Sequence, residues 1–151
     1  MSFFWENKQK KQLRCDLLSI EAENKAKKMN DEAKDKDKMN KYSQIRKFYD
    51  EVISHKTFIL SRPDGEQNEI FKQRLPYIKM MNAKLVYSQA RGYLSSGFVK
   101  MIKECINEVK DLDDFYAFTD FFEAFLAFYR QYKDKEGKDN TQYNNRNYGR
   151  Y

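Results

Sequence analysis

The sequence predicts an all-α protein, a compact bundle of about five helices in a single helical domain over residues 1–133. Three observations lead to this prediction. The chain has 151 residues, which is the length of one domain. Its 5 Gly and 2 Pro are too few for a sandwich or barrel, which needs a turn about every 8 to 12 residues. Its 12 Phe and 11 Tyr supply apolar groups to an otherwise highly charged chain, so the core should be aromatic.

The composition also excludes several classes of protein. Two cysteines are too few for a disulfide scaffold and fit a reducing compartment, and we expect Cys105 to be a small buried hydrophobe. His55 alone leaves too few soft ligands for a metal site, so we expect neither a metal nor another cofactor. No apolar run approaches the roughly 18 residues of a membrane span, and no secretion signal opens the chain. We therefore expect a soluble, cytoplasmic protein without a membrane partner.

The net charge of +6 is concentrated in the first part of the chain. Residues 1–94 carry 20 basic and 13 acidic side chains, whereas residues 95–133 carry 5 and 7. The stretch 70–103 has no acid and contains Lys72, Arg74, Lys79, Lys84, Arg91, Lys100 and Lys103. The basic side chains of this stretch have no acidic neighbours within it to pair with. We therefore expect a partner to supply the negative charge. The alternative is chance combined with a need for solubility.

The N-terminal part of the chain predicts one helix and one connection. Residues 3–5 are aromatic, and the leucines after them recur at loose helical spacing, so we expect a helix that ends near Asn30. Residues 30–41 mix Asp, Lys and Asn with few apolar side chains, and such a segment has no face to bury. We expect residues 30–41 to be a mobile charged connection.

The next helix should begin at Ser43, whose hydroxyl is a candidate N-cap. Its apolar positions recur every three or four residues and are Tyr42, Ile45, Phe48, Tyr49 and Val52. On the other side of this helix, Arg46 and Asp50 form one i,i+4 pair. Lys47 and Glu51 form another. This arrangement predicts a helix with one buried face and one solvated face.

Two further helices are expected between residues 67 and 112. A helical pattern over 67–91 is interrupted at Pro76, where the ring either kinks the helix or starts a new one, because proline cannot donate to the preceding turn. Gly92 is a candidate helix stop. The hydroxyl of Ser95 or Ser96 should cap the helix that follows.

The last helix should begin at Asp111 and carries two aromatic stripes. One consists of Phe115, Phe118, Phe122, Phe125, Leu126 and Tyr129, and the other of Ala117, Phe121, Ala124, Phe128 and Tyr132. A surface helix needs one apolar face, so this helix is either central or shared with a second copy, and Phe121, Phe128 and Tyr132 are the candidate self-association residues. Residues 134–151 contain no aliphatic side chain and should form a disordered tail.

No constellation of residues in the sequence supports catalysis. A nucleophile needs a base, and a metal-dependent nuclease needs clustered carboxylates. The one dense acidic cluster, Asp111, Asp113 and Asp114, is explained by the positive end of the helix dipole. Glu123 stands among aromatic residues and should pair with a basic residue of a neighbouring helix, or else serve as a functional acid. We expect a protein that is not an enzyme.

Three segments of the chain together resemble a known family. They read SQIRKFYDE over 43–51, LPYI over 75–78 followed by AKLVY over 83–87 and AR over 90–91, and FFEAF over 121–125. Over roughly residues 40–132 the chain resembles the small helical subunit of the type III-A CRISPR-Cas (Csm) interference complex. The segment 22–41 and the tail are not part of this resemblance.

The resemblance implies a non-catalytic subunit that stacks in copies along the effector complex in antiviral defence. Its implied partners are the guide RNA, the target RNA, the repeated backbone subunit and the large subunit. The candidate RNA-binding residues are Arg46, Lys47, Lys84 and Arg91 from the matched segments, and Lys79 from the acid-free stretch. Binding to a guide-target duplex should lack sequence specificity, because such a duplex is recognised by backbone and shape. The alternative is a protein-interaction module that self-associates through its aromatic last helix.

Overall fold

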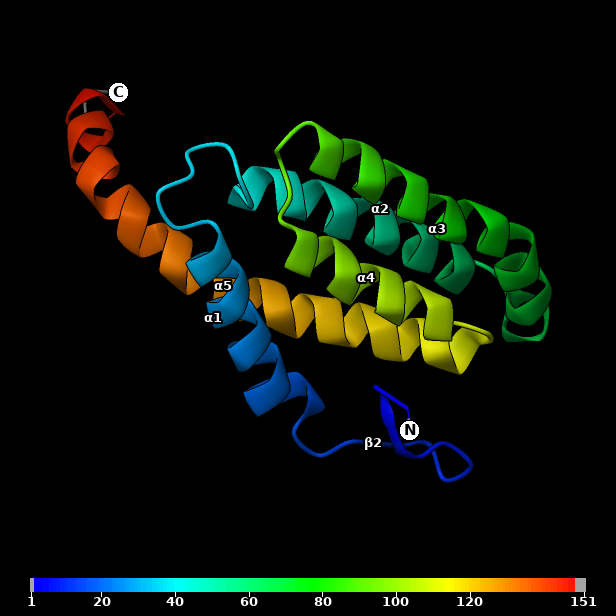
Figure 1. The fold of residues 1–151 in the computed structure, drawn as a ribbon. Coiled ribbons are helices and arrows are strands. Elements are labelled where there is room, and N and C mark those ends of the chain that lie inside the picture. The colour runs from blue at the N-terminus through cyan, green and yellow to red at the C-terminus, as the bar shows by residue number, and fades with distance from the viewer. Residues whose placement is uncertain (1, 149–151) are drawn as a thin grey trace.

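The computed structural model of the chain describes the backbone of residues 2–148 and the side chains of residues 2–133 (Figure 1). Its elements are strand β1 (Trp5–Asn7), strand β2 (Gln12–Leu13), a π-helical turn (Leu17–Glu21), α1 (Ala22–Glu32), α2 (Tyr42–Leu60), a 3-10 turn (Asp64–Glu66), α3 (Gln67–Ala90), α4 (Ser96–Glu108) and α5 (Leu112–Tyr148). The predicted all-α bundle of about five helices is confirmed. The tail predicted over residues 134–151 lies outside the residues whose side chains are described.

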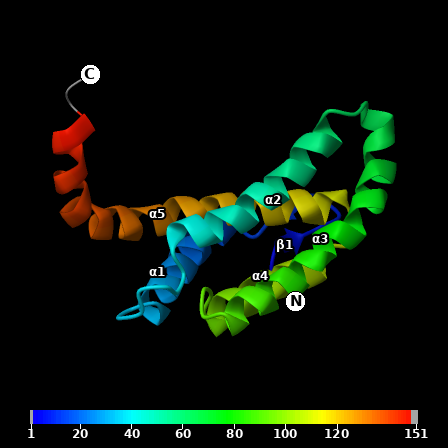
Figure 2. The ribbon, with the colours of Figure 1, turned by 90° about the horizontal axis from the view of Figure 1, so that it is seen from above.

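Helix α5 is the central element of the bundle. It packs against both α1 and α2, while α3 packs against α2 and α4 (Figure 1, Figure 2). Its fully buried aromatic side chains are Phe115, Phe118, Phe121, Phe122, Phe125 and Tyr129. Helix α5 therefore occupies a central position, which is one of the two explanations for its aromatic faces. Within the described residues, no helix combines the length and the apolar character that a membrane crossing requires.

The N-terminal residues form a hairpin, which the sequence did not predict. β1 pairs antiparallel with β2, with Trp5 opposite Leu13. Phe4 is fully buried, and the ring of Phe3 packs edge-on against Phe121 with centroids 5.0 Å apart. The turn was not recognised because Lys11 adopts φ +54°, a conformation that sequence patterns reserve for Gly or Asn.

The helix ends agree with most of the predicted capping residues. Ser95 caps α4, since its Oγ accepts the backbone N–H of Phe98 at 3.2 Å. Gly92 follows α3 with φ +81°, as a helix stop requires. α3 continues through Pro76, and Figure 2 shows that it is bent. Ser43 as an N-cap is wrong, because α2 already begins at Tyr42 after an extended residue.

A buried asparagine fixes the end of the charged connection. Asn40 is 0 % exposed, and its Nδ2 donates to the carbonyl of Met29 at 3.1 Å and to Ser95 Oγ at 2.9 Å. Its Oδ1 accepts the backbone N–H of Ser95 at 2.9 Å, and its carbonyl accepts from the hydroxyl of Tyr129. Asn40 therefore joins α1, the start of α4 and α5. For the residues before it, the predicted mobility stays a prediction.

Candidate functional site

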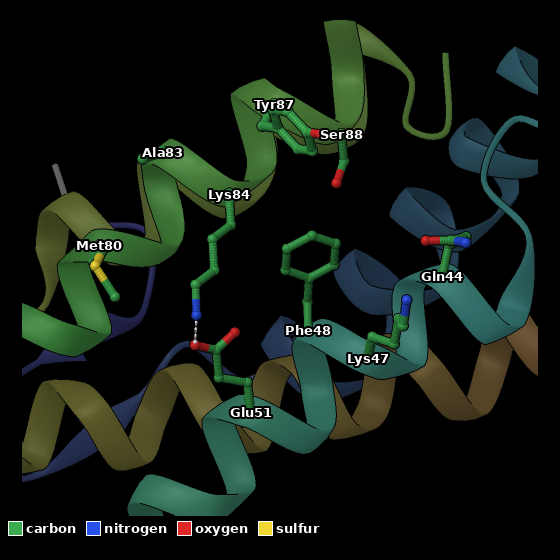
Figure 3. Close-up of a pocket in the computed structure, with 9 residues that line it drawn as sticks. All are labelled: Gln44, Lys47, Phe48, Glu51, Met80, Ala83, Lys84, Tyr87 and Ser88. Atoms are coloured by element: carbon green, nitrogen blue, oxygen red, sulfur yellow. Dashed lines mark hydrogen bonds and ion pairs between the residues drawn. The ribbon is translucent and has the colours of Figure 1, made fainter. Parts of the chain in front are cut away.

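A groove runs between α2 and α3. Figure 3 shows its lining: the ring of Phe48 stands on α2 between the two helices, while Met80, Ala83 and Tyr87 come from α3. The volume of the groove is about 480 Å³, and Lys47 is also among its lining residues. This lining is mostly apolar, with basic side chains added from both helices.

A second hollow of about 530 Å³ continues the groove along the same two helices. It shares Glu51, Met80 and Lys84 with the first and adds, among others, His55, Phe58, Arg74 and Tyr77. The two hollows together follow α2 and α3 over several turns. They therefore form one elongated surface feature, which we call the α2–α3 groove.

A cross-helix ion pair stands at the junction of the two hollows. Lys84 Nζ on α3 lies 2.5 Å from Glu51 Oε1 on α2 (Figure 3). The predicted pair between Lys47 and Glu51 is therefore wrong, because Glu51 reaches across the groove to Lys84, a partner that helix spacing alone does not reveal. The predicted pair of Arg46 with Asp50 is present, with the two charged groups 3.8 Å apart. Lys47 remains exposed at the groove.

The side of α3 that faces the groove carries exposed rings. Tyr77 is 60 % exposed and Tyr87 is 63 % exposed. Arg91 donates to the hydroxyl of Tyr87 at 3.1 Å, and its guanidinium carbon lies 5.6 Å from the Tyr87 ring centre and 5.3 Å from that of Tyr93. The hydrogen bond to Tyr87 raises the pKa of Arg91 above its ordinary value. The exposed Arg91 guanidinium is thus in contact with two tyrosine rings.

The far end of the groove contains a neutral histidine. His55 is buried, and its Nδ1 lies 3.1 Å from Arg74 Nη1, which places an acceptor nitrogen opposite the guanidinium. Burial lowers the pKa of His55, and the positive charge of Arg74 lowers it further. Arg74 also lies 3.6 Å from the ring centre of Phe58. Arg74 was not among the predicted site residues, because its partners come from α2.

The structure separates the five candidate RNA-binding residues. Lys47 and Lys84 line the groove, and Arg91, the residue just after the end of α3, follows Lys84 by seven positions and so lies on the same side about two turns further on. Arg46 stands beside Lys47 but turns toward α2's own Asp50 and Tyr42, whose hydroxyl it reaches at 3.3 Å. Lys79 is exposed on another side of α3, about 140° around the helix from Lys84.

The three candidate self-association residues are also separated. Phe121 is fully buried in the core of the chain itself, while Phe128 and Tyr132 are half-buried. Among these three, only Phe128 and Tyr132 therefore retain surface that a second copy could reach. Self-association stays a prediction.

The acidic side chains at the start of α5 form ion pairs and a hydrogen bond with side chains of the hairpin. Lys8 Nζ lies 2.7 Å from Asp111 Oδ2 and 2.9 Å from Asp114 Oδ1, and the indole N–H of Trp5 donates to Asp114 at 2.8 Å.

Within the described residues, no group of three or more His, Cys, Asp or Glu side chains could hold a metal ion. Cys105 is buried, as predicted, which raises the pKa of its thiol well above the ordinary value.

The pairing predicted for Glu123 is wrong. Its side chain is exposed, and none of the ion pairs between described residues includes it. The nearby Phe122 and Phe125 are buried in the core. Glu123 lies on the opposite side of the helix, so its carboxylate faces solvent.

Comparison with known families decides where the chain belongs. The sequence model of the family described as Csm2 Type III-A matches residues 15–135. The chain belongs to this family. It is therefore a subunit of the type III-A CRISPR-Cas Csm complex, and the resemblance seen in the sequence is confirmed. The match includes residues 22–41, which the three sequence segments left out, whereas the N-terminal hairpin precedes it. No curated protein and no solved structure matches the chain significantly.

Proposed function

We propose that this Csm2-family chain is a non-catalytic, cytoplasmic subunit that binds the guide RNA and target RNA through the α2–α3 groove. The observation that carries the proposal is the convergence of Lys47 and Lys84 from two helices on one groove, with Arg91 in line with Lys84. Binding is to the RNA backbone and is independent of sequence. Further copies of the chain, the repeated backbone subunit and the large subunit are its proposed protein partners.

The charges around the groove suit a polyanion. The stretch 70–103 supplies no acid, and Glu51, the acid that lines the groove, is neutralised by Lys84. Arg91 already contacts two tyrosine rings in the free chain, and such contacts reduce the side-chain entropy that an arginine loses when it binds a phosphate. Contacts of this kind release counterions from RNA, which makes affinity depend on salt but not on base sequence.

A binding experiment with the full chain tests this proposal. Fluorescence anisotropy with two labelled RNA duplexes of unrelated sequence should give similar affinities that fall steeply as salt rises. The double variant Lys84→Gln, Arg91→Gln should weaken binding to both duplexes by the same factor, and each lost phosphate contact should reduce the slope of log affinity against log salt by roughly 0.7 to 0.9.

The matched control is the double variant Lys10→Gln, Lys28→Gln, which removes the same charge from exposed positions outside the groove. It should retain most of the affinity. Equal losses in the two double variants would show that only net charge matters, and binding that ignores salt would remove the proposal altogether. Circular dichroism checks that each variant keeps its helices.

A second candidate function is self-association through α5. It is supported by the half-buried Phe128 and Tyr132 and by the way α5 extends beyond the bundle in Figure 1. Phe128→Asp should lower the mass measured by light scattering if this face joins two copies. An unchanged mass would exclude Phe128 from the contact. Phe121 is unsuited to this test, because its replacement would disrupt the core.

A further inference from the structure

The α2–α3 groove contains more than phosphate binding requires. A phosphate backbone needs cations at intervals, yet the lining between these cations is Phe48, Met80, Ala83 and Tyr87. Four of the large apolar side chains exposed on the described surface belong to α3, and they are Tyr77, Met80, Val86 and Tyr87. Exposed rings and an apolar hollow suit a flat, unsolvated group.

We propose that the α2–α3 groove holds an unpaired base of the bound RNA, with Tyr87 as its stacking surface. Lys47, Lys84 and Arg91 contact the phosphates on either side of that base. This inference rests on the proposed RNA-binding function and specifies its ligand: an RNA strand with at least one base outside the double helix.

The geometry of Tyr87 suits stacking. Its ring is 63 % exposed, and the hydrogen bond from Arg91 to its hydroxyl fixes one edge of the ring. Each base offers a flat π-face, so stacking on a tyrosine adds affinity without selecting a sequence. A base that remains paired within a duplex is covered by its neighbours, and it cannot reach a ring in a groove between two helices.

The charge pattern favours RNA over an acidic protein helix as the occupant. A docked helix is usually anchored by apolar side chains in a row of apolar pockets, whereas this groove is divided by the pair of Lys84 with Glu51. The cation nearest the exposed ring is an arginine already packed on aromatic faces, an arrangement that contacts bases and phosphates together.

The test compares three labelled RNA probes with the full chain. The first is a fully paired duplex, the second contains a single unpaired adenosine, and the third contains an abasic residue at the same bulge. The second probe should bind at least about five-fold more tightly than the first, since one stacked base commonly contributes that factor or more. The abasic probe should lose this advantage while the same backbone bend remains.

Variants of the ring assign the effect to Tyr87. Tyr87→Ala should abolish the preference for the bulged probe, and Tyr87→Phe should keep it, because the ring is retained. Val86→Ala removes another exposed apolar side chain of α3, one that does not line the groove, and it should bind like the parent. Both positions are exposed, so we expect all three variants to fold.

The outcomes separate this inference from the proposed function. If the three probes bind equally and Tyr87→Ala changes nothing, while Lys84→Gln, Arg91→Gln still weakens binding, the base inference is wrong and backbone binding stands. If no RNA probe binds, both fall. A labelled acidic amphipathic peptide that binds in place of RNA and is lost in Tyr87→Ala would identify a protein helix as the occupant and overturn the inference.

Discussion

The N-terminal hairpin and the α2–α3 groove use the same kinds of residue in opposite ways. At the hairpin, Lys8 and Trp5 are satisfied by Asp114 of the same chain, and the adjoining Phe4 is buried. At the groove, Lys47 and the ring of Tyr87 remain exposed. Lys8 and the aromatic side chains at the hairpin therefore contribute to stability, whereas Lys47 and the Tyr87 ring of the groove are available to a partner. Substitutions in both regions test this contrast, and the buried Asn40 provides a comparison from a third region.

The largest difference is expected between two aromatic substitutions. Phe4→Ala should lower the free energy of unfolding by about 3 to 5 kcal/mol, because it empties a fully buried site. Tyr87→Ala should change it by less than about 0.5 kcal/mol, because the ring is already in water. Urea denaturation followed by circular dichroism measures both. Similar losses in the two variants would show that the groove is part of the core.

The hydrogen bonds of Asn40 connect α1, the start of α4 and α5. Its replacement should have the second largest effect on the free energy of unfolding. Asn40→Ala leaves a buried backbone N–H of Ser95 without its acceptor and puts alanine, which disfavours a positive φ more than asparagine does, at φ +53°, so we expect a loss of about 3 kcal/mol. Asn40→Gly tolerates this backbone conformation and should lose about 1 kcal/mol less. Thermal denaturation compares the two variants, and equal losses would contradict the role of the backbone conformation.

The charged contact between the hairpin and α5 should depend on pH at its extremes. Burial opposes the charged form of Lys8, but its hydrogen bonds to Asp111 and Asp114 outweigh this effect and raise its pKa above 10.5. Burial also opposes ionisation of Asp111, but the hydrogen bonds from Lys8 and from the backbone N–H of Asp114 prevail and lower its pKa below 3.8. This stabilisation is therefore present between about pH 4 and pH 10 and is lost outside that range.

Lys8→Gln removes this contact. Between about pH 4 and pH 10 it should reduce the free energy of unfolding by less than about 1 kcal/mol, because Lys8 is partly exposed. The difference from the parent should shrink below and above that range. Denaturation curves at several pH values measure it, with Lys10→Gln as a control that removes an exposed charge from the same turn. A difference that is constant across pH would exclude an ionic origin.

His55 should produce the smallest effect, and it should occur in mild acid. Its pKa is lowered, first by burial and then by Arg74 and Lys84, against the opposing charge of Glu51. The unfolded chain therefore binds a proton more readily, so stability is complete above about pH 6.5 and falls as the pH drops through the lowered pKa. His55→Gln should remove this fall. Unfolding curves between pH 7 and pH 5 test the prediction, and an unchanged slope would contradict it.

Most of the fold could be predicted because it depends on local patterns. The spacing of apolar side chains located the helices, and Ser95 and Gly92 marked two of their ends correctly. The hairpin was missed because its strands are three and two residues long and its turn uses Lys11 in a glycine-like conformation. Asn40 was missed because a buried asparagine and a solvated one look alike in a charged segment.

The candidate site was predictable only in part. Lys84 and Arg91 were identified from the segments that resemble the family, and their spacing of seven positions places them on one side of a helix. That Lys84 pairs with Glu51 and that Arg74 meets His55 depends on how α2 packs beside α3. Lys79 came from a count of charges along the sequence, which does not record the face of the helix on which each one lies, and its contact with RNA stays a prediction.

The sequence by itself determined that this protein is a helical bundle with an aromatic core, a basic first part and membership of a recognisable family, since each follows from composition, periodicity or short motifs. Only the tertiary structure decided which charged side chains form ion pairs within the chain. Lys8 is satisfied by acids more than 100 residues away, while Lys47 loses its expected partner to Lys84. Such pairings depend on which side chains packing brings within a few ångströms, and the order of residues along the chain does not contain that information.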